Sequence, residues 1–182
     1  MRDYYRNTSR SSRSLLQGEG TGVYQEPTFT DPPVTQSMRP AVEADNNYQQ
    51  SASAQLAGQK FIKSHHGAYL RAWRGENRGP NWLVDMAPHC NAREHWYIED
   101  HGGKVVFRAY GLPAKYLRAQ PNGQVDLVDQ AEAWEMWTPI QITNGTWSFR
   151  SHHGTWLRAQ PSGVVSLQTH AKADEQFTLG SW

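Results

Sequence analysis

Three residues within a stretch of seven could ligate a metal: His89, Cys90 and His95. A structural zinc site needs four ligands with regular spacing, and the chain contains no second cysteine. We therefore interpret these side chains as loop residues, and we predict neither a metal nor another cofactor. The sequence also contains no nucleophile elbow, phosphate-binding loop or HExxH run. This pattern predicts a protein that binds a partner rather than an enzyme.

Two histidine pairs recur at equivalent positions, His65-His66 and His152-His153, and a glycine follows each pair. Histidine titrates near pH 6.5, so the four imidazoles could form a pH-sensitive patch that binds a partner. The alternative is a structural turn, in which one imidazole of each pair caps backbone groups and the other faces solvent.

An arginine follows a leucine in the same motif three times, at Arg71, Arg118 and Arg158. Because side chains alternate along a strand, these arginines should point outward while the leucines point into the core. Each guanidinium could pair with a glutamate that recurs about 20 residues further along the chain. These glutamates are Glu94, Glu135 and Glu175. Alternatively, the three arginines could form a basic ring that binds an acidic filament surface.

The motifs belong to an internal repeat that covers residues 59–182. Three stretches align, namely FIKSHHGAYLRAW, VVFRAYGLPAKYLRAQPNGQVDL and WSFRSHHGTWLRAQPSGVVSL. A Glu-x-aromatic signature follows each stretch in phase, as Glu-His-Trp, Glu-Met-Trp and Glu-Gln-Phe. Each copy predicts four short strands, and a Pro-Asn-Gly or Pro-Ser-Gly turn joins the second and third strands of the later copies. The first copy has a longer loop, RGENRGPNW, in place of that turn.

Three four-stranded copies are too few for a β-propeller, which normally has four to eight blades. Twelve strands in three hairpin-bearing copies suit a six-stranded barrel capped by three hairpins, so we predict an all-β fold, the β-trefoil. The repeated leucines and large aromatic residues should fill the barrel, with further apolar side chains beside them. The first set is Leu70, Leu117, Leu157, Trp96, Trp137 and Phe177, and the second is Ile62, Phe107, Phe149, Val125, Leu127, Val165 and Leu167.

The repeat unit resembles that of the fascin-like and actin-crosslinking β-trefoils, a family related to the histidine-rich hisactophilin. A typical unit of that family reads HG-x-Tyr-Leu-x-Ala followed by Gly-x-Val. The resemblance spans about residues 60–182 and implies the fold and an association with actin filaments. The matching positions are His66-Gly67, Tyr69-Leu70, Ala72, His153-Gly154, Trp156-Leu157, Ala159, Gly163 and Val165.

The chain departs from that family in two ways. Its second copy has Gly111-Leu-Pro-Ala in place of His-His-Gly, and it carries one trefoil where fascins carry four. The Gln-x-Trp signature of ricin-type lectins, which share the fold, is also missing, because the corresponding positions read Glu-x-Trp, Glu-x-Trp and Gln-Phe.

The segment 1–58 differs from the rest of the chain because it contains no tryptophan, histidine or cysteine. Its prolines prevent a continuous helix, and its polar composition cannot offset the entropy of ordering, so we expect an N-terminal arm of low order in isolation. A short helix through AVEADNNYQQSASAQLA, residues 41–57, is one exception that the sequence allows. The arm could order along a protein partner through side chains near its start. These candidate residues are Arg2, Tyr4, Tyr5, Arg6, Arg10 and Arg13.

Charge and composition limit the classes of partner. The formal net charge is +1, which gives no reason to expect nucleic acid or an anionic membrane. No stretch approaches the roughly 20 apolar residues that cross a bilayer. A single cysteine agrees with a reducing compartment. We therefore expect a cytoplasmic, cytoskeleton-associated protein that binds a filament or serves as a structural subunit of a large assembly.

Carbohydrate binding is the alternative function. A sugar site needs an aromatic platform beside acidic or amide groups in an open loop. One cluster in the sequence offers this combination, and it consists of Trp73, Asn81, Trp82 and Asp85.

Overall fold

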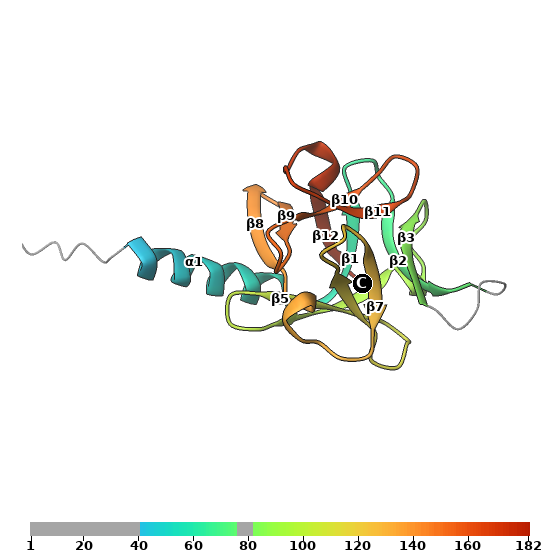
Figure 1. The fold of residues 1–182 in the computed structure, drawn as a ribbon, viewed down its shortest axis with the longest axis horizontal. Coiled ribbons are helices and arrows are strands. Elements are labelled where there is room, and N and C mark those ends of the chain that lie inside the picture. Colours follow the sequence, from blue (N-terminus) through green and yellow to red (C-terminus); the bar gives the residue numbers. More distant parts are fainter. Residues whose placement is uncertain (1–40, 76–81) are drawn as a thin grey trace, which may run out of the picture. The chain divides into compact units, whose positions relative to one another are not determined.

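The computed structural model of the protein describes residues 41–75 and 82–182, with side chains from residue 43 onward (Figure 1). Within these ranges the chain forms one α-helix, twelve β-strands and three short 3-10 helices. Their bounds are α1 (Ala41–Leu56), β1 (Gly58–Ser64), β2 (Tyr69–Arg74), β3 (Trp82–Ala87), η1 (Ala92–Glu94), β4 (His95–Asp100), β5 (Val105–Ala109), β6 (Tyr116–Ala119), β7 (Val125–Val128), η2 (Ala133–Glu135), β8 (Thr138–Thr143), β9 (Thr146–Arg150), β10 (Trp156–Ala159), β11 (Val165–Gln168), η3 (Ala173–Glu175) and β12 (Phe177–Ser181).

Six of the strands close into a barrel. Antiparallel pairing runs from β8 through β9, β12, β1 and β4 to β5. The ring is completed where Val105 of β5 and Trp137, just before β8, exchange two backbone hydrogen bonds of 2.8 and 2.9 Å. Each barrel strand therefore has a neighbour on both sides, which protects its backbone groups from pairing with another chain.

The other six strands form three hairpins, β2–β3, β6–β7 and β10–β11 (Figure 1). Gly123 and Gly163 hold the turns of the second and third hairpins at φ values of +89° and +88°, as the Pro-x-Gly motifs predict. The hairpins meet one another: Met86 N–H donates to the Gly163 carbonyl at 2.9 Å, and Leu167 N–H donates to the Gly123 carbonyl at 3.0 Å. A six-stranded barrel with three such hairpins is a β-trefoil, which confirms the predicted fold.

The predicted core is confirmed as well. The three repeated leucines and the three repeated aromatic residues are at most 1% exposed: Leu70, Leu117, Leu157, Trp96, Trp137 and Phe177. The indole N–H groups are satisfied in this apolar interior, since Trp96 donates to the Leu70 carbonyl at 2.8 Å and Trp137 to the Leu117 carbonyl at 3.1 Å. Of the flanking apolar set, Val125 and Leu167 are only half-buried and pack at the margin of the core.

The repeated glutamates end the short 3-10 helices, which the sequence did not predict. Each carboxylate is 2–3% exposed and accepts the backbone N–H of the residue three positions earlier, at 2.6–2.7 Å. The fourth strand of the third copy therefore begins at Phe177, two residues after Glu175. The donors are Asn91, Glu132 and Lys172, and the acceptors are Glu94, Glu135 and Glu175.

Helix α1 covers all but the last residue of the segment for which the sequence allowed a helix, and it belongs to the same compact unit as the trefoil. Its last turns pack against β4 and β8, where Ala52 is 3% and Leu56 is 4% exposed. Ser53 links the two parts, because its hydroxyl accepts the N–H of Gly103 in the β4–β5 turn at 3.1 Å. The predicted domain boundary after residue 58 stays a prediction. The last turns of α1, which lie before that boundary, pack on the barrel wall.

Candidate functional site

The first two repeated arginines form two-pronged ion pairs with aspartates on the neighbouring strand. Arg71 of β2 donates to both carboxylate oxygens of Asp85 at 2.8 and 2.7 Å. Arg118 of β6 binds Asp126 in the same way at 2.8 and 2.5 Å. These hydrogen bonds raise the pKa of both guanidinium groups above the ordinary arginine value.

In the third copy the repeated arginine pairs with an aspartate from a different element. The strand position of the aspartate is occupied by Ser166, and Arg158 instead pairs with Asp174 of η3 at 3.1 and 2.8 Å. The predicted glutamate partners lie further away, for example at 3.6 Å between Arg158 Nε and Glu175 Oε1. All three arginines thus form ion pairs with neighbouring aspartates, and their role in partner binding stays a prediction.

The two histidine pairs form tight turns. In each pair the second imidazole contacts the neighbouring copy: His66 Nε2 lies 2.8 Å from Asp174 Oδ1, and His153 Nε2 lies 3.2 Å from the Ala119 carbonyl oxygen. The first members, His65 and His152, are exposed. In the third copy His153 contacts a backbone carbonyl, as the structural interpretation of the pairs expects. In the first copy His66 contacts a carboxylate and is itself exposed. The role of both pairs in partner binding stays a prediction.

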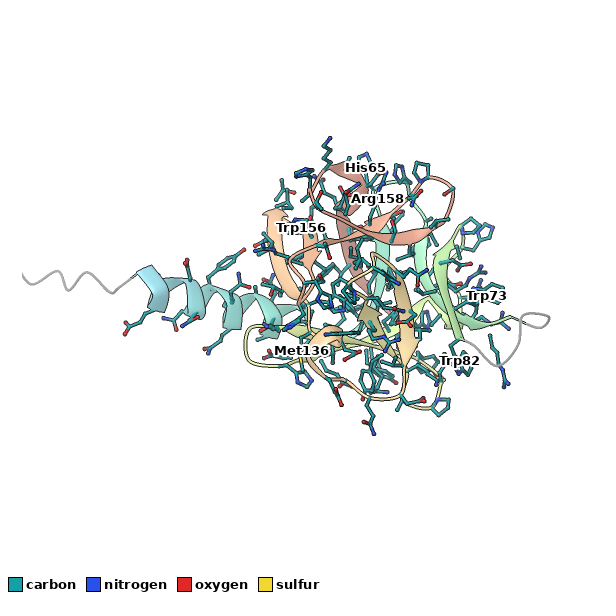
Figure 2. All side chains as sticks on the ribbon, viewed as in Figure 1. His65, Trp73, Trp82, Met136, Trp156 and Arg158 are labelled. Atoms are coloured by element: carbon teal, nitrogen blue, oxygen red, sulfur yellow. The ribbon has the colours of Figure 1, made fainter. Side chains whose placement is uncertain are left out.

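Asp174 joins the third copy to the first, because it binds both Arg158 and His66. Arg158 first, and then His66, lower the pKa of this carboxyl below its ordinary value. Figure 2 labels Arg158 and the neighbouring His65 at this junction.

Seven of the predicted site residues lie outside the described part of the chain: Arg2, Tyr4, Tyr5, Arg6, Arg10, Arg13 and Asn81.

The predicted sugar-binding cluster is not assembled as the sequence suggested. Trp73 pairs with Leu83 across the β2–β3 hairpin and Trp82 pairs with Arg74, so the two indoles belong to opposite faces of the hairpin. Asp85 is held by Arg71. Figure 2 shows both tryptophans on this hairpin. Trp82 alone of the three described residues lines a hollow.

That hollow, here called the Trp82 hollow, lies between β3, β7 and β11 and has a volume of about 810 Å³. Lys115 is its most buried charged group, with a side chain that is 11% exposed. It forms an ion pair with Asp129, and its ammonium lies 5.7 Å from the centre of the Trp82 ring. Gln120 and Gln124 add amide groups to the wall.

A second feature, which the sequence motifs did not predict, is an aromatic surface formed by His95, Tyr97, Tyr110 and Trp182. His95 stacks on Trp182 with ring centres 4.3 Å apart and planes 8° apart. Tyr110 meets the same indole edge-on at 4.6 Å, and Tyr97 lies 5.8 Å from it. Tyr110 is 37% exposed, whereas the other three rings are half-buried.

Arg108 completes this surface. Its guanidinium carbon lies 4.3 Å above the Tyr97 ring, and its Nε donates to Glu99 at 2.5 Å. The indole N–H of Trp182 donates to the Lys60 carbonyl at 3.2 Å, which fixes the orientation of the ring. The cluster is therefore held in place by stacking and hydrogen bonds without any partner.

The aromatic surface occupies one of three equivalent boundaries between copies. Tyr110 N–H donates to the His95 carbonyl at 3.0 Å, just as His65 N–H donates to the Gln176 carbonyl at 3.0 Å. By this equivalence the other two boundaries carry histidine in place of Tyr110, methionine or glutamine in place of His95, and threonine in place of Tyr97. These residues are His65, His152, Met136, Gln176, Thr138 and Thr178. Comparing these three alignment columns shows the aromatic substitutions in the sequence, but not their contact with Trp182.

The β5–β6 turn that carries Tyr110 also departs from the repeat in its backbone. Ala114 has a φ of 29°, the one positive value among the described non-glycine residues. Such a conformation costs free energy and persists only where the surroundings enforce it. The copy that lacks His-His-Gly is thus the copy with the strained turn and the exposed tyrosine.

Within the described residues, no group of three or more histidine, cysteine, aspartate or glutamate side chains could hold a metal ion. Cys90 is half-buried, and burial raises the pKa of its thiol. None of the described helices is both long enough and apolar enough to cross a membrane.

Comparison with known proteins gives structural neighbours alone. No protein-family model and no curated protein sequence matches the chain. Among solved structures, hisactophilin aligns with a TM-score of 0.55 and 28% identity over 69% of this chain and 99% of its own length. Its structure is described as similar to interleukin-1β and fibroblast growth factor.

Other neighbours share the β-trefoil at lower identity. SeviL, solved with the asialo-GM1 saccharide bound, aligns with a TM-score of 0.58 and 16% identity over 69% of this chain and 98% of its own. An endo-β-galactosidase from Clostridium perfringens aligns with a TM-score of 0.58 and 14% identity, but this chain spans only 33% of the enzyme. The neighbours thus include a saccharide-bound protein and part of a glycoside hydrolase, so the fold by itself assigns no activity.

Proposed function

We propose that this protein is a non-enzymatic binding protein that associates with a cytoskeletal filament, with actin as the first filament to test. The observation that carries the proposal is the aromatic surface, which stands at one boundary of the trefoil where the other two boundaries carry histidine, threonine and methionine or glutamine. A structural role in the fold does not require it, because the other two boundaries form the same barrel with histidine, threonine and methionine or glutamine.

The composition of the surface suits contact with another protein. Tyrosine, tryptophan and arginine are the residues that most often dominate binding energy at protein interfaces. Tyr110, Trp182 and Arg108 bring these three types together. Because stacking already fixes the rings, little side-chain entropy is lost when a partner covers them.

The resemblance of the repeat unit to actin-crosslinking trefoils supports the choice of filament. The 28% identity with hisactophilin over its whole length agrees with that resemblance. A cytoplasmic location and a role as a subunit of a larger assembly belong to the same proposal.

The N-terminal arm supplies a second contact in this proposal. One trefoil with one binding surface attaches to a filament once, whereas crosslinking needs two attachment points. We assign the second contact to the segment 1–58, through Arg2, Arg6, Arg10, Arg13, Tyr4 and Tyr5.

Cosedimentation with actin filaments tests the proposal. We expect full-length protein to pellet with filaments and Tyr110→Ala to bind about 30-fold more weakly, as for an interface residue worth roughly 2 kcal/mol. His152→Ala is the matched control, because His152 holds the equivalent exposed position at another boundary. It should bind like the unmodified protein.

Two results would count against the proposal. Full-length protein that stays in the supernatant at every filament concentration would remove actin as the partner. Loss of binding in His152→Ala with retention in Tyr110→Ala would move the contact to the histidine turns.

Carbohydrate binding, the alternative that the sequence leaves open, is favoured by a different part of the molecule, the Trp82 hollow.

A further inference from the structure

The Trp82 hollow arises where the first two copies both depart from the repeat. The position of Trp82 is held by the turn glycines Gly123 and Gly163 in the other copies. Lys115 and Asp129 likewise occur only in the second copy, since the other copies have different residues at these two positions. The residues equivalent to Lys115 are Ala68 and Thr155, and those equivalent to Asp129 are Pro88 and Thr169. The other copies form the same fold without these three side chains. The fold therefore does not require Trp82, Lys115 or Asp129.

Among the residues that line the hollow, two cations and two carboxylates balance in charge, and Arg74 lies outside this lining with its guanidinium carbon 5.9 Å from the centre of the Trp82 ring. Lys115 pairs with Asp129, and Arg118 pairs with Asp126. The Gln120 amide also donates to Asp126 at 2.7 Å, so the carboxylate and both donors are held in fixed positions. A wall with two cations and two carboxylates offers no net attraction to a phosphate, a sulfate or another ion.

The same wall also disfavours a purely apolar ligand. Such a ligand would remove the charged and amide groups from water without replacing the hydrogen bonds that water makes with them. The remaining class is a neutral molecule with many hydroxyl groups and one apolar face. A sugar ring has both: its C–H face can pack on the indole, and its hydroxyls can bond to carboxylate, amide and ammonium groups at once.

Size and position agree with this class. The volume of about 810 Å³ lies within the range of roughly 300–1,000 Å³ that ligand pockets occupy. Asp129 is 76% exposed at the rim, so its carboxylate can accept a hydroxyl hydrogen bond while it holds Lys115. Val164, which is 51% exposed, adds a small apolar wall from the third hairpin.

We infer that the Trp82 hollow is a binding site for a neutral oligosaccharide, with Trp82 as the stacking platform and Asp129, Lys115 and Gln124 as hydrogen-bonding groups. This site is separate from the aromatic surface, and its occupancy does not depend on filament binding.

An array of immobilised oligosaccharides tests the inference with the full chain. The array holds neutral glucose-, galactose-, mannose- and N-acetylhexosamine-containing glycans, together with sialylated and sulfated forms of the same glycans. We expect at least one neutral glycan to be bound, and its acidic forms to be bound no better. Trp82→Leu keeps an apolar side chain against the core but removes the flat ring, so binding should fall at least tenfold.

Two further variants make the result decisive. Trp134→Leu changes an exposed tryptophan outside the hollow and should bind the glycan normally. Gln124→Ala changes an exposed wall residue outside the core and should weaken glycan binding several-fold. If Trp82→Leu fails to fold, the binding of Gln124→Ala tests the inference in its place. The inference is overturned if no neutral glycan binds, if only acidic glycans bind, or if folded Trp82→Leu binds as well as the unmodified chain. Unchanged actin cosedimentation by Trp82→Leu would separate this site from the filament contact.

Discussion

Among individual residues, burial and exposure divide the repeated side chains into two energetic groups. The repeated arginines and their aspartates have side chains that are 24–32% exposed, and ion pairs in such positions contribute about 0–1 kcal/mol each. The repeated tryptophans are fully buried with satisfied N–H groups, and their apolar area contributes several times more. The motif that is easiest to see in the sequence is therefore not the one that dominates stability.

Trp137→Ala should lower the free energy of unfolding by about 3–5 kcal/mol, because it leaves a cavity beside Leu117 and removes a buried hydrogen bond. For a chain of this length the midpoint of thermal unfolding should fall by roughly 6–20 °C. Trp134→Ala, at a position that is 39% exposed, is the control and should cost less than about 1 kcal/mol. Equal shifts for both variants would place Trp137 outside the core.

Asp174→Asn should lower thermal stability near neutral pH, with an effect that disappears in acid. The folded pKa of Asp174 lies below its unfolded value, so its contribution is complete above the unfolded pKa of about 3.9 and is lost as pH falls through the folded pKa. Melting curves from pH 3 to pH 7 on the order of one unit apart check this. Asp45→Asn, an exposed change on α1, is the control and should shift the midpoint equally at every pH. A deficit in Asp174→Asn that is as large at about pH 3 as at about pH 7 would contradict the assignment.

The secondary-structure elements follow one repeated order, to which helix α1 is added. Each copy places a barrel strand, a hairpin, a 3-10 helix and a second barrel strand in the same order. Helix α1 has no counterpart in the repeat, and it covers part of the barrel wall at β4 and β8. Gly103 permits this approach, since a Cβ there would lie 3.3 Å from the Gln49 Cβ and its φ is +99°.

Leu56→Ala should lower the free energy of unfolding by about 2–4 kcal/mol, because Leu56 is 4% exposed where α1 meets the barrel. Urea denaturation measures the loss, and hydrogen exchange at the Gly103 amide should accelerate if the helix detaches locally. Gln55→Ala, one position earlier and exposed, should change neither quantity. Unchanged stability in Leu56→Ala would mean that α1 contributes nothing to the folded trefoil.

The repeat made the fold and core predictable, because in-phase leucines and tryptophans report burial directly. Less regular features were not predictable in the same way. The aspartate partners of Arg71 and Arg118 are set by the register between the two hairpin strands, which the sequence pattern did not define. The third copy has Ser166 in place of that aspartate. The aromatic surface joins His95, Tyr110 and Trp182, and Trp182 reaches the other two only through the pairing of β12, β1, β4 and β5. The sugar cluster was assigned from neighbours in sequence, and strand alternation separates Trp73 from Trp82.

At the scale of the molecule, the described residues form a trefoil frame with helix α1 packed on its barrel, and two groups of side chains that the frame does not need stand out. The aromatic surface lies at a boundary between copies, and the Trp82 hollow lies where the hairpins meet. Our account assigns function to these two groups and stability to the repeat.

Restoring the repeat at the aromatic surface tests this central claim most directly. The triple variant His95→Gln, Tyr97→Thr and Tyr110→His gives this boundary the residues of the boundary between the third and first copies. We predict that it keeps a melting midpoint within a few degrees of the unmodified protein and loses at least tenfold in affinity for actin filaments in cosedimentation. A folded triple variant that binds filaments as tightly as the unmodified protein would contradict the account.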